Sequence, residues 1–337
     1  MPSFSLRTGV SFSYTDSGAP RNQQTDYVTL ILLHGIIFHN GTFASLAAIG
    51  PSNGVRVIAI NRRGYPGTTP YSAEELALFV SGNEDDKERL LADMGRDLAL
   101  LIAELITSLS LPAYVAVVEW SLGSLQVLSL VASIETLPQD ARGTLTRSVR
   151  SMILFQSPSV IFGVADPQGL YIPQNDPHIP ANELGTFFSR WVSSFFVHGD
   201  LSTRDACALT YDRTDPHRLP TTARIPMNHL TDFAAGFKYD ATLISSSFSG
   251  VAAKLVDKTL FDVHVRGELL KDTRFFVLSS SADSWTTIYA SWKLEERMLA
   301  EAKPECSITF KMVEGANHFF MIEDPQGTID CFMRCCA

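Results

Sequence analysis

The chain has 337 residues, of which 45% are hydrophobic and 19% are charged, and its formal net charge is −9. This composition is typical of a globular protein with a large core and excludes a disordered chain. The sequence has no block rich in lysine and arginine and no run of 18 apolar residues. We therefore expect neither a nucleic-acid partner nor a membrane span.

The N-terminal stretch and the cysteines indicate a location and argue against a metal. Residues 1–14 contain one arginine and no long apolar core, so we expect no secretory signal. The five cysteines are an odd number, which indicates free thiols in a reducing compartment and predicts a cytoplasmic protein. The sequence has no Cys-x-x-Cys and no His-Glu-x-x-His motif, so we expect no metal site.

Short apolar segments alternate with longer helical segments along most of the chain. This pattern is typical of a mostly parallel sheet with helices on both faces. The expected strands cover residues 28–33, 55–60, 114–118, 151–155, 274–278 and 307–313. The expected helices cover residues 84–109, 124–134 and 323–335. The sequence therefore predicts an α/β protein.

Between about residues 158 and 270 the pattern changes, because prolines and aspartates become frequent and apolar strands vanish. We expect this segment to be a helical cap inserted into a core that is formed by residues 1–157 and 271–337. A cap above the strand ends of an open α/β sheet is where ligands bind. Phe187, Phe188 and Trp191 fall on one helical face and are candidate pocket residues.

Ser121 is the candidate nucleophile. It lies in the segment Val-Val-Glu-Trp-Ser-Leu-Gly-Ser, residues 117–124, between an apolar strand and a helical stretch. A strand that turns sharply into a helix lifts one side chain clear of the backbone, as in a nucleophile elbow. Gly123 suits the tight turn because it has no Cβ.

A serine nucleophile needs a base within hydrogen-bond reach, and the base needs an acid that orients it. In elbow-type hydrolases the chain order is serine, acid, histidine. His318 follows the last expected strand, and Asp283 lies in a turn-rich loop after the preceding strand. We expect His318 to be the base and Asp283 to be its acid. Asp283 could instead cap the helix that begins near Thr286.

The negative charge that develops on a substrate oxygen needs fixed N–H donors. We expect one donor to be the backbone N–H of Leu122, at the start of the helix after Ser121, where N–H groups have no helical partner. The second would be the N–H of Ile36, which follows His34-Gly35 at the end of the strand 28–33.

Taken together, these segments resemble the α/β-hydrolase superfamily, and more loosely its capped fungal members. The similarity is carried, in the family's order, by Leu33-His34-Gly35-Ile36, Asn61-Arg62-Arg63-Gly64-Tyr65-Pro66-Gly67, Trp120-Ser121-Leu122-Gly123, Asp283 and Gly315-Ala316-Asn317-His318-Phe319. The resemblance implies a central eight-stranded, mostly parallel sheet with a helical cap. It also implies a serine–aspartate–histidine triad and no required cofactor.

Glu119 departs from the family pattern, which has a small residue two positions before the nucleophile. Three hypotheses follow for Glu119: it is accommodated beside normal hydrolysis, it is an added acid–base group, or it distorts the elbow and leaves a site that only binds. A buried and unpaired carboxylate would be costly or would take up a proton. Glu119 and Trp120 are further candidate pocket residues.

The sequence thus predicts a serine hydrolase that cleaves an ester, thioester or lactone of a small, mostly apolar molecule. One alternative is a non-hydrolytic enzyme on the same scaffold, such as a lyase, isomerase or cyclase. Another is a ligand-binding protein that has lost catalysis.

Overall fold

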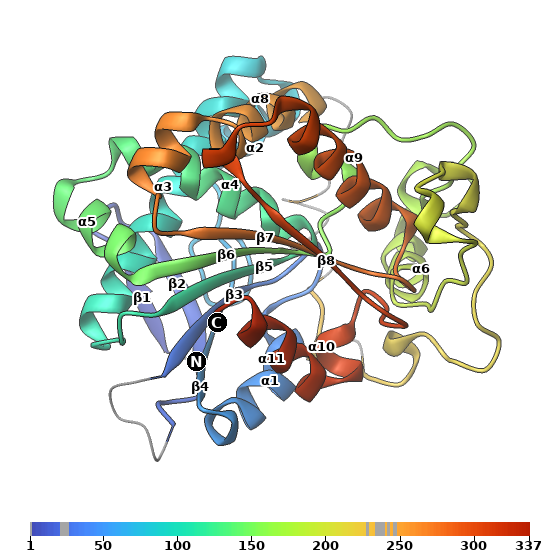
Figure 1. Ribbon diagram of the computed structural model, residues 1–337, viewed down its shortest axis with the longest axis horizontal. Helices are drawn as coiled ribbons and strands as arrows, with labels where there is room; N and C mark the ends of the chain where they lie inside the picture. Colours follow the sequence, from blue (N-terminus) through green and yellow to red (C-terminus); the bar gives the residue numbers. More distant parts are fainter. Residues whose placement is uncertain (1, 21–26, 227–228, 233–239, 241–242, 245–247) are drawn as a thin grey trace.

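The computed structural model describes residues 2–20, 27–226, 229–232, 240, 243–244 and 248–337. Eight strands form one sheet in the order β1-β2-β4-β3-β5-β6-β7-β8 (Figure 1). They are β1 (Ser3–Ser5), β2 (Ser11–Asp16), β3 (Val28–Leu33), β4 (Val55–Ile60), β5 (Val115–Trp120), β6 (Val149–Phe155), β7 (Arg274–Ser280) and β8 (Thr309–Val313). In this order, neighbouring strands from β4 to β8 pair in parallel. The pair β1–β2 and the pair β2–β4 are antiparallel. The predicted eight-stranded, mostly parallel sheet is confirmed.

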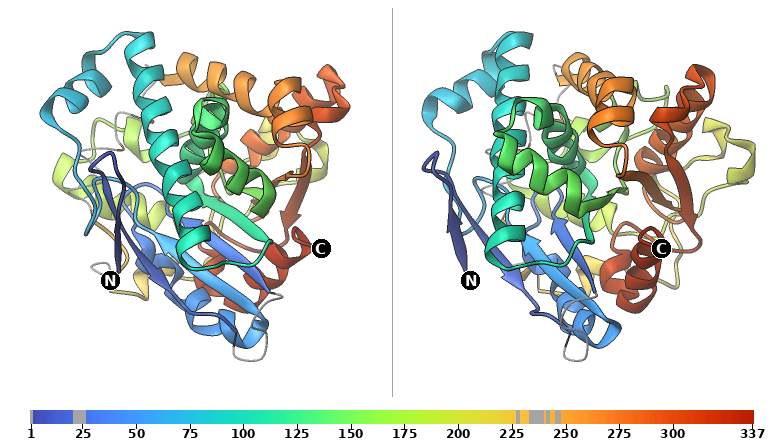
Figure 2. Two further views of the ribbon diagram at one scale, coloured as in Figure 1. Left: turned by 90° about the vertical axis from the view of Figure 1, so that its left-hand side faces the viewer. Right: turned by 60° about the vertical axis from the view of Figure 1, so that its left-hand side comes forward.

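The central strands are buried on both faces, which explains their continuous apolar sequences. Every residue of β4 and β5 is buried, and in β3 only Val28 is partly exposed. The strands β1 and β2, which pair at one edge, were not predicted (Figure 2). The sequence of β2 alternates serine and threonine with aromatic residues, so it lacks the apolar run by which the central strands were recognised.

Helices cover both faces of the sheet (Figure 1). They are α1 (Ala44–Ile49), α2 (Ala73–Ser81), α3 (Glu84–Ser108), α4 (Ser124–Ser133), α5 (Gln139–Ser148), α6 (Ala181–Val192), α8 (Ser249–Leu260), α9 (Trp285–Glu301), α10 (Phe320–Glu323) and α11 (Pro325–Arg334). On one face, α3 packs against α4 and α5, and α4 packs against α8. On the other face, α1 packs against α10 and α11.

Local sequence explains where the long helix α3 begins. The side chain of Asn83 accepts a hydrogen bond from the backbone N–H of Asp86, and the side chain of Asp86 accepts one from the N–H of Asn83. This reciprocal capping satisfies two N–H groups that have no partner within the helix. The acidic first turn also suits the helix dipole.

Two helices from the predicted insertion lie in different places. Helix α6 lies beyond one end of the sheet (Figure 1), whereas α8 packs against α4 in the layer that covers the sheet. Within the described residues, no helix combines the length and the apolar character that are needed to cross a membrane.

Candidate active site

Ser121 lies in a tight turn between β5 and α4. Its φ is +59°, a backbone conformation that residues other than glycine rarely adopt. The surrounding structure must hold such a conformation in place. A Cβ on Gly123 would lie 2.8 Å from the carbonyl oxygen of His34, so a larger residue would push the turn away from the loop after β3. The predicted strand, turn and helix around Ser121 are therefore present.

His318, in the loop after β8, contacts Asp283, in the loop after β7. The Nδ1 atom of His318 lies 3.0 Å from both carboxylate oxygens of Asp283. Because a carboxylate only accepts hydrogen bonds, Nδ1 carries the ring hydrogen and Nε2 remains free to accept a proton. Asp283 also accepts hydrogen bonds from the backbone N–H of Ser284 at 2.5 Å and the hydroxyl of Thr287 at 2.9 Å.

Ser121 and His318 line one cavity of about 670 Å³. Ile36 and Leu122, the two residues that are predicted to supply oxyanion donors, line the same cavity. The loop after β3 lies close to the turn that holds Ser121, because a Cβ on Gly35 would lie 2.9 Å from the Cβ of Ser121. Residues from the ends of β3, β5 and β8 thus meet at the carboxyl edge of the sheet, where open α/β sheets bind ligands.

The cavity wall is mostly apolar and includes part of the predicted insertion. Phe188 and Trp191 of α6 are among the residues that line it. Phe187 does not belong to its lining, and 46% of its surface is exposed to solvent. The expectation for Phe187 is therefore wrong: it lies one helical step, about 100°, away from Phe188 and points outward.

Trp120 is also absent from the cavity lining, contrary to expectation. Its side chain is buried, and its Nε1–H donates to the carbonyl oxygen of His318 at 3.0 Å and to Oε1 of Gln156 at 3.1 Å. The Nε2 atom of Gln156 donates in turn to the hydroxyl of Ser280 and to the carbonyl oxygen of Asn317, both at 2.7 Å. Sequence reasoning missed Gln156, for which the loop after β6 gives no signal.

Glu119 is fully buried and does not line the cavity, which differs from the expectation that it is a pocket residue. Its Oε2 accepts a hydrogen bond from the backbone N–H of Val127, in the first turn of α4, at 2.5 Å. Its Oε1 has no hydrogen-bond partner among the described residues. Burial raises the pKa of the Glu119 carboxyl well above its usual range, against the opposing effects of the Val127 N–H and the charge of Arg62. The protonated form is thus favoured.

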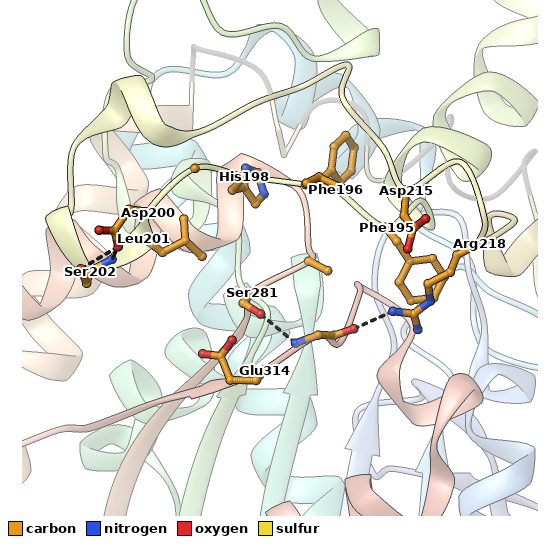
Figure 3. A pocket seen from close by; sticks show the side chains of 14 residues that line it. Phe195, Phe196, His198, Asp200, Leu201, Ser202, Asp215, Arg218, Ser281 and Glu314 are labelled. Atoms are coloured by element: carbon orange, nitrogen blue, oxygen red, sulfur yellow. Dashed lines mark hydrogen bonds between the residues drawn. The ribbon is translucent and has the colours of Figure 1, made fainter.

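A second cavity, of about 580 Å³, borders the loops that lead to Asp283 and His318 (Figure 3). Polar groups in its wall bind one another. The guanidinium of Arg218 donates to the carbonyl oxygen of Gly315 at 3.0 Å, and the N–H of Gly315 donates to the hydroxyl of Ser281 at 2.8 Å. The second bond joins the loop before His318 to the loop before Asp283, and the first joins the loop before His318 to the predicted insertion.

His198, in the wall of the second cavity, supports the Asp283 loop. Its Nδ1 accepts a hydrogen bond from the N–H of Thr210 at 3.0 Å, so Nε2 carries the hydrogen and donates to the carbonyl oxygen of Asp283 at 2.8 Å. Burial lowers the pKa of His198, which favours this neutral form. The sequence offered no signal that distinguishes His198 from the other histidines of the insertion.

Comparisons with known proteins agree with this architecture. The model of the alpha/beta hydrolase family matches residues 30–330, whereas a comparison with curated protein sequences gave no match. Est816, an N-acyl homoserine lactone degrading enzyme, is 14% identical with a TM-score of 0.56 over 99% of each chain. Epoxide hydrolase A from Mycobacterium thermoresistibile is 15% identical with a TM-score of 0.54, over 99% of this chain and 97% of that chain. An epoxide hydrolase from Vigna radiata is 12% identical with a TM-score of 0.53, over 99% of this chain and 96% of that chain.

At such identities these likenesses concern the fold alone. The family model, however, matches residues 30–330, which is most of this chain. The chain therefore belongs to the alpha/beta hydrolase family.

Proposed function

We propose that this protein is a serine hydrolase that cleaves an ester, thioester or lactone of a small, mostly apolar molecule. One arrangement carries the proposal: Ser121 and His318 line the same cavity, and the ring of His318 is oriented by Asp283. A hydroxyl, a base with a free Nε2 and a fixed carboxylate are the parts that nucleophilic acyl transfer requires.

In the proposed reaction, Nε2 of His318 removes the proton of Ser121 as its oxygen attacks the substrate carbonyl carbon. Asp283 keeps the hydrogen on Nδ1 and stabilises the imidazolium that forms. His318 then protonates the leaving group as its bond to the carbonyl carbon breaks, which leaves an acyl group on Ser121. Water that gives a proton to His318 attacks this acyl-enzyme and releases the acid, and the proton returns to Ser121.

The N–H groups of Ile36 and Leu122 are the proposed donors to the substrate oxyanion. Both residues line the cavity beside Ser121. Donors that are already fixed before the reaction stabilise the developing charge without reorganisation, and the loss of one donor typically lowers kcat by about 10²–10³-fold.

The chemistry of a serine favours carbonyl substrates over epoxides, although two of the structural neighbours are epoxide hydrolases. Attack of Ser121 on an epoxide would form an alkyl ether, and hydrolysis by water would not readily regenerate the serine. Attack on an ester, thioester or lactone gives an acyl-enzyme that activated water can cleave. The apolar wall, which includes Val160, Leu184 and Phe188, favours an apolar acyl or aryl group.

We also propose that part of the segment 158–270 acts as a lid over this cavity. Helix α6 contributes Leu184, Phe188 and Trp191 to the wall, which supports this role. The packing of α8 against α4 favours a lid that ends before α8, rather than at residue 270.

Turnover of aryl esters tests the function. The proposal predicts saturable hydrolysis by the wild type and a fall in kcat of at least about 10³-fold in Ser121→Ala, because the covalent route is lost. Wild-type protein that reacts with a fluorophosphonate at Ser121 but turns over no ester, thioester or lactone would favour a lyase or cyclase instead. Protein that neither reacts nor turns over these substrates would favour a binding protein.

A further inference from the structure

The peptide between Gly35 and Ile36 is held from one side by two side chains. Its carbonyl oxygen, on Gly35, lies 2.9 Å from Nη2 of Arg62 and 3.0 Å from Nδ1 of His34. Both side chains are buried. The carbonyl therefore has two donors fixed within the core, and its direction is set by them.

The hydrogen-bond pattern of His34 defines which ring nitrogen donates. The backbone N–H of Arg62 donates to Nε2 of His34 at 3.0 Å, so Nδ1 carries the hydrogen and donates to Gly35. Burial lowers the pKa of His34 well below its usual value, and the charge of Arg62 acts in the same direction. A neutral ring is the form that this pattern needs.

The orientation of this carbonyl also fixes the Ile36 N–H. In a trans peptide the C=O and N–H bonds lie in one plane and point in opposite directions. With the Gly35 oxygen held by Arg62 and His34, the N–H of Ile36 must point away from both. Ile36 lines the cavity together with Ser121, which is where an oxyanion would form. An N–H that points away from Arg62 and His34 and toward this cavity would be placed to donate to that oxyanion.

The next peptide is held by Tyr65. The N–H of Ile37 donates to the hydroxyl oxygen of Tyr65 at 2.9 Å. The φ of Ile37 is +58°, which is unfavourable for a β-branched residue and persists only where neighbours enforce it. Arg62 and Tyr65, both from the segment after β4, thus fix two consecutive peptides of this loop.

Asp240, from the predicted insertion, holds Arg62 and Tyr65 in turn. Its carboxylate accepts from Nη1 of Arg62 at 2.9 Å and from Nη2 at 2.6 Å, and it also accepts from the hydroxyl of Tyr65. The side chains of Arg62 and Asp240 are each only 2% exposed. A buried ion pair is costly to desolvate and therefore requires additional hydrogen bonds, which Gly35 and Tyr65 supply here.

We propose that Arg62 is a positioning residue, held by Asp240 and Tyr65, that turns the N–H of Ile36 toward the substrate oxyanion. This inference rests on the proposed function. It links the insertion to the chemical step, because Asp240 belongs to the insertion and Ile36 to the core. Loss of the network frees the Gly35–Ile36 peptide to rotate, and one oxyanion donor is then lost.

The double variant Arg62→Met with Asp240→Asn tests the proposal without leaving an uncompensated buried charge. A matched control is Arg56→Met with Asp16→Asn, which removes the bidentate pair at the opposite end of β4. We expect kcat of the test variant on an aryl ester to fall about 10²-fold with little change in KM, and kcat of the control to stay within about twofold.

Inhibitor affinity separates a lost oxyanion donor from a damaged pocket. A trifluoromethyl ketone forms an anionic adduct with the serine, whereas the matching alcohol only fills the pocket. We expect the ketone to lose affinity in parallel with kcat/KM while the alcohol binds as before, because only the anion uses the Ile36 N–H.

Tyr65→Phe, which removes only a hydroxyl, is a second variant for the case that the double variant does not fold. We expect it to lower the affinity for the ketone and to leave the affinity for the alcohol unchanged. Unchanged kcat and ketone affinity in the folded variants, or equal losses for both inhibitors, would overturn the inference while the hydrolase function stands. Absence of wild-type ester turnover would overturn the proposed function and this inference together.

Discussion

The indole ring of Trp120 contacts both the backbone and the imidazole ring of His318. The indole Nε1–H donates to the carbonyl oxygen of His318 at 3.0 Å, and the two ring centroids are 5.0 Å apart. The residue before the candidate nucleophile therefore holds the candidate base. Gln156 extends this contact, because its amide joins Trp120 to Ser280 at the end of β7 and to Asn317 in the loop after β8.

Replacement of Gln156 by alanine is expected to lower the free energy of unfolding by about 2–4 kcal/mol. The change leaves the carbonyl oxygen of Asn317 and the hydroxyl of Ser280 buried without a donor from residue 156, and each such loss costs about 1–3 kcal/mol. Gln326→Ala, at an exposed position of α11, is the control and should change stability by less than about 0.5 kcal/mol. Urea unfolding measures both variants, and equal stabilities would contradict the role of Gln156.

Asp283→Asn should leave the fold intact and reduce kcat by about 10⁴-fold, as such a change does in a serine–histidine–aspartate triad. The asparagine amide favours the tautomer in which Nδ1 of His318 accepts, and Nε2 then carries a hydrogen and cannot take the proton of Ser121. Ester turnover over a range of pH measures the effect. Asp205→Asn, in the insertion, is the control, and wild-type kcat in Asp283→Asn would exclude Asp283 as the orienting acid.

The contribution of the Glu119 carboxyl to the free energy of unfolding is expected to fall as pH rises. Its folded-state pKa is raised by burial above the ordinary value of 4.5, so above that value the folded state holds a proton that the unfolded state has lost. The stability contributed by the neutral carboxyl is therefore present at low pH and is lost progressively toward the folded-state pKa. Glu119→Gln has no such titration.

The measurement for Glu119 is the difference in unfolding free energy between wild type and Glu119→Gln, followed from about pH 5 to about pH 8. We expect the variant to gain on the wild type as pH rises, while its kcat stays within about twofold because Glu119 lies outside the cavity lining. Parallel stability curves would contradict a raised pKa. A large loss of kcat would favour the hypothesis of an added acid–base group.

Phe187 and Phe188 are adjacent in α6 and form a matched pair. Phe188 is 8% exposed and lines the cavity, whereas Phe187 is 46% exposed and lies outside the cavity lining. Phe188→Ala should cost about 3 kcal/mol of stability and raise KM for apolar esters, because it removes both core packing and cavity wall. Phe187→Ala should change stability by less than about 0.5 kcal/mol and leave KM unchanged. Equal effects of the two changes would contradict the placement of α6.

Much of the fold was predictable because buried parallel strands have a distinct sequence pattern. The predicted bounds of β3 and β4 agree with the structure, and α3 ends one residue before its predicted end. The edge strands β1 and β2 lack a continuous apolar run, so they were missed. The residues that form α8 were included in the predicted insertion because the composition changes over residues 158–270. Composition does not show which surface a helix covers, and α8 packs against α4.

The site could be predicted only where chain order carries information. Ser121, Asp283 and His318 each follow a strand in the order of an elbow-type hydrolase, so the sequence indicated them. Gln156 and Asp240 contact partners far away in the chain, and these contacts arise only after folding. Trp120 was wrongly placed in the pocket, because the sequence does not show toward which neighbours a side chain next to a tight turn is directed.

Peptide mapping by mass spectrometry after reaction with a fluorophosphonate tests the central claim most directly. The account predicts one covalent adduct on Ser121 in the wild type, none on that peptide in Ser121→Ala, and a labelling rate in His318→Ala that is lower by at least about 10²-fold. An adduct on a different residue, or equal labelling rates in wild type and His318→Ala, would contradict it.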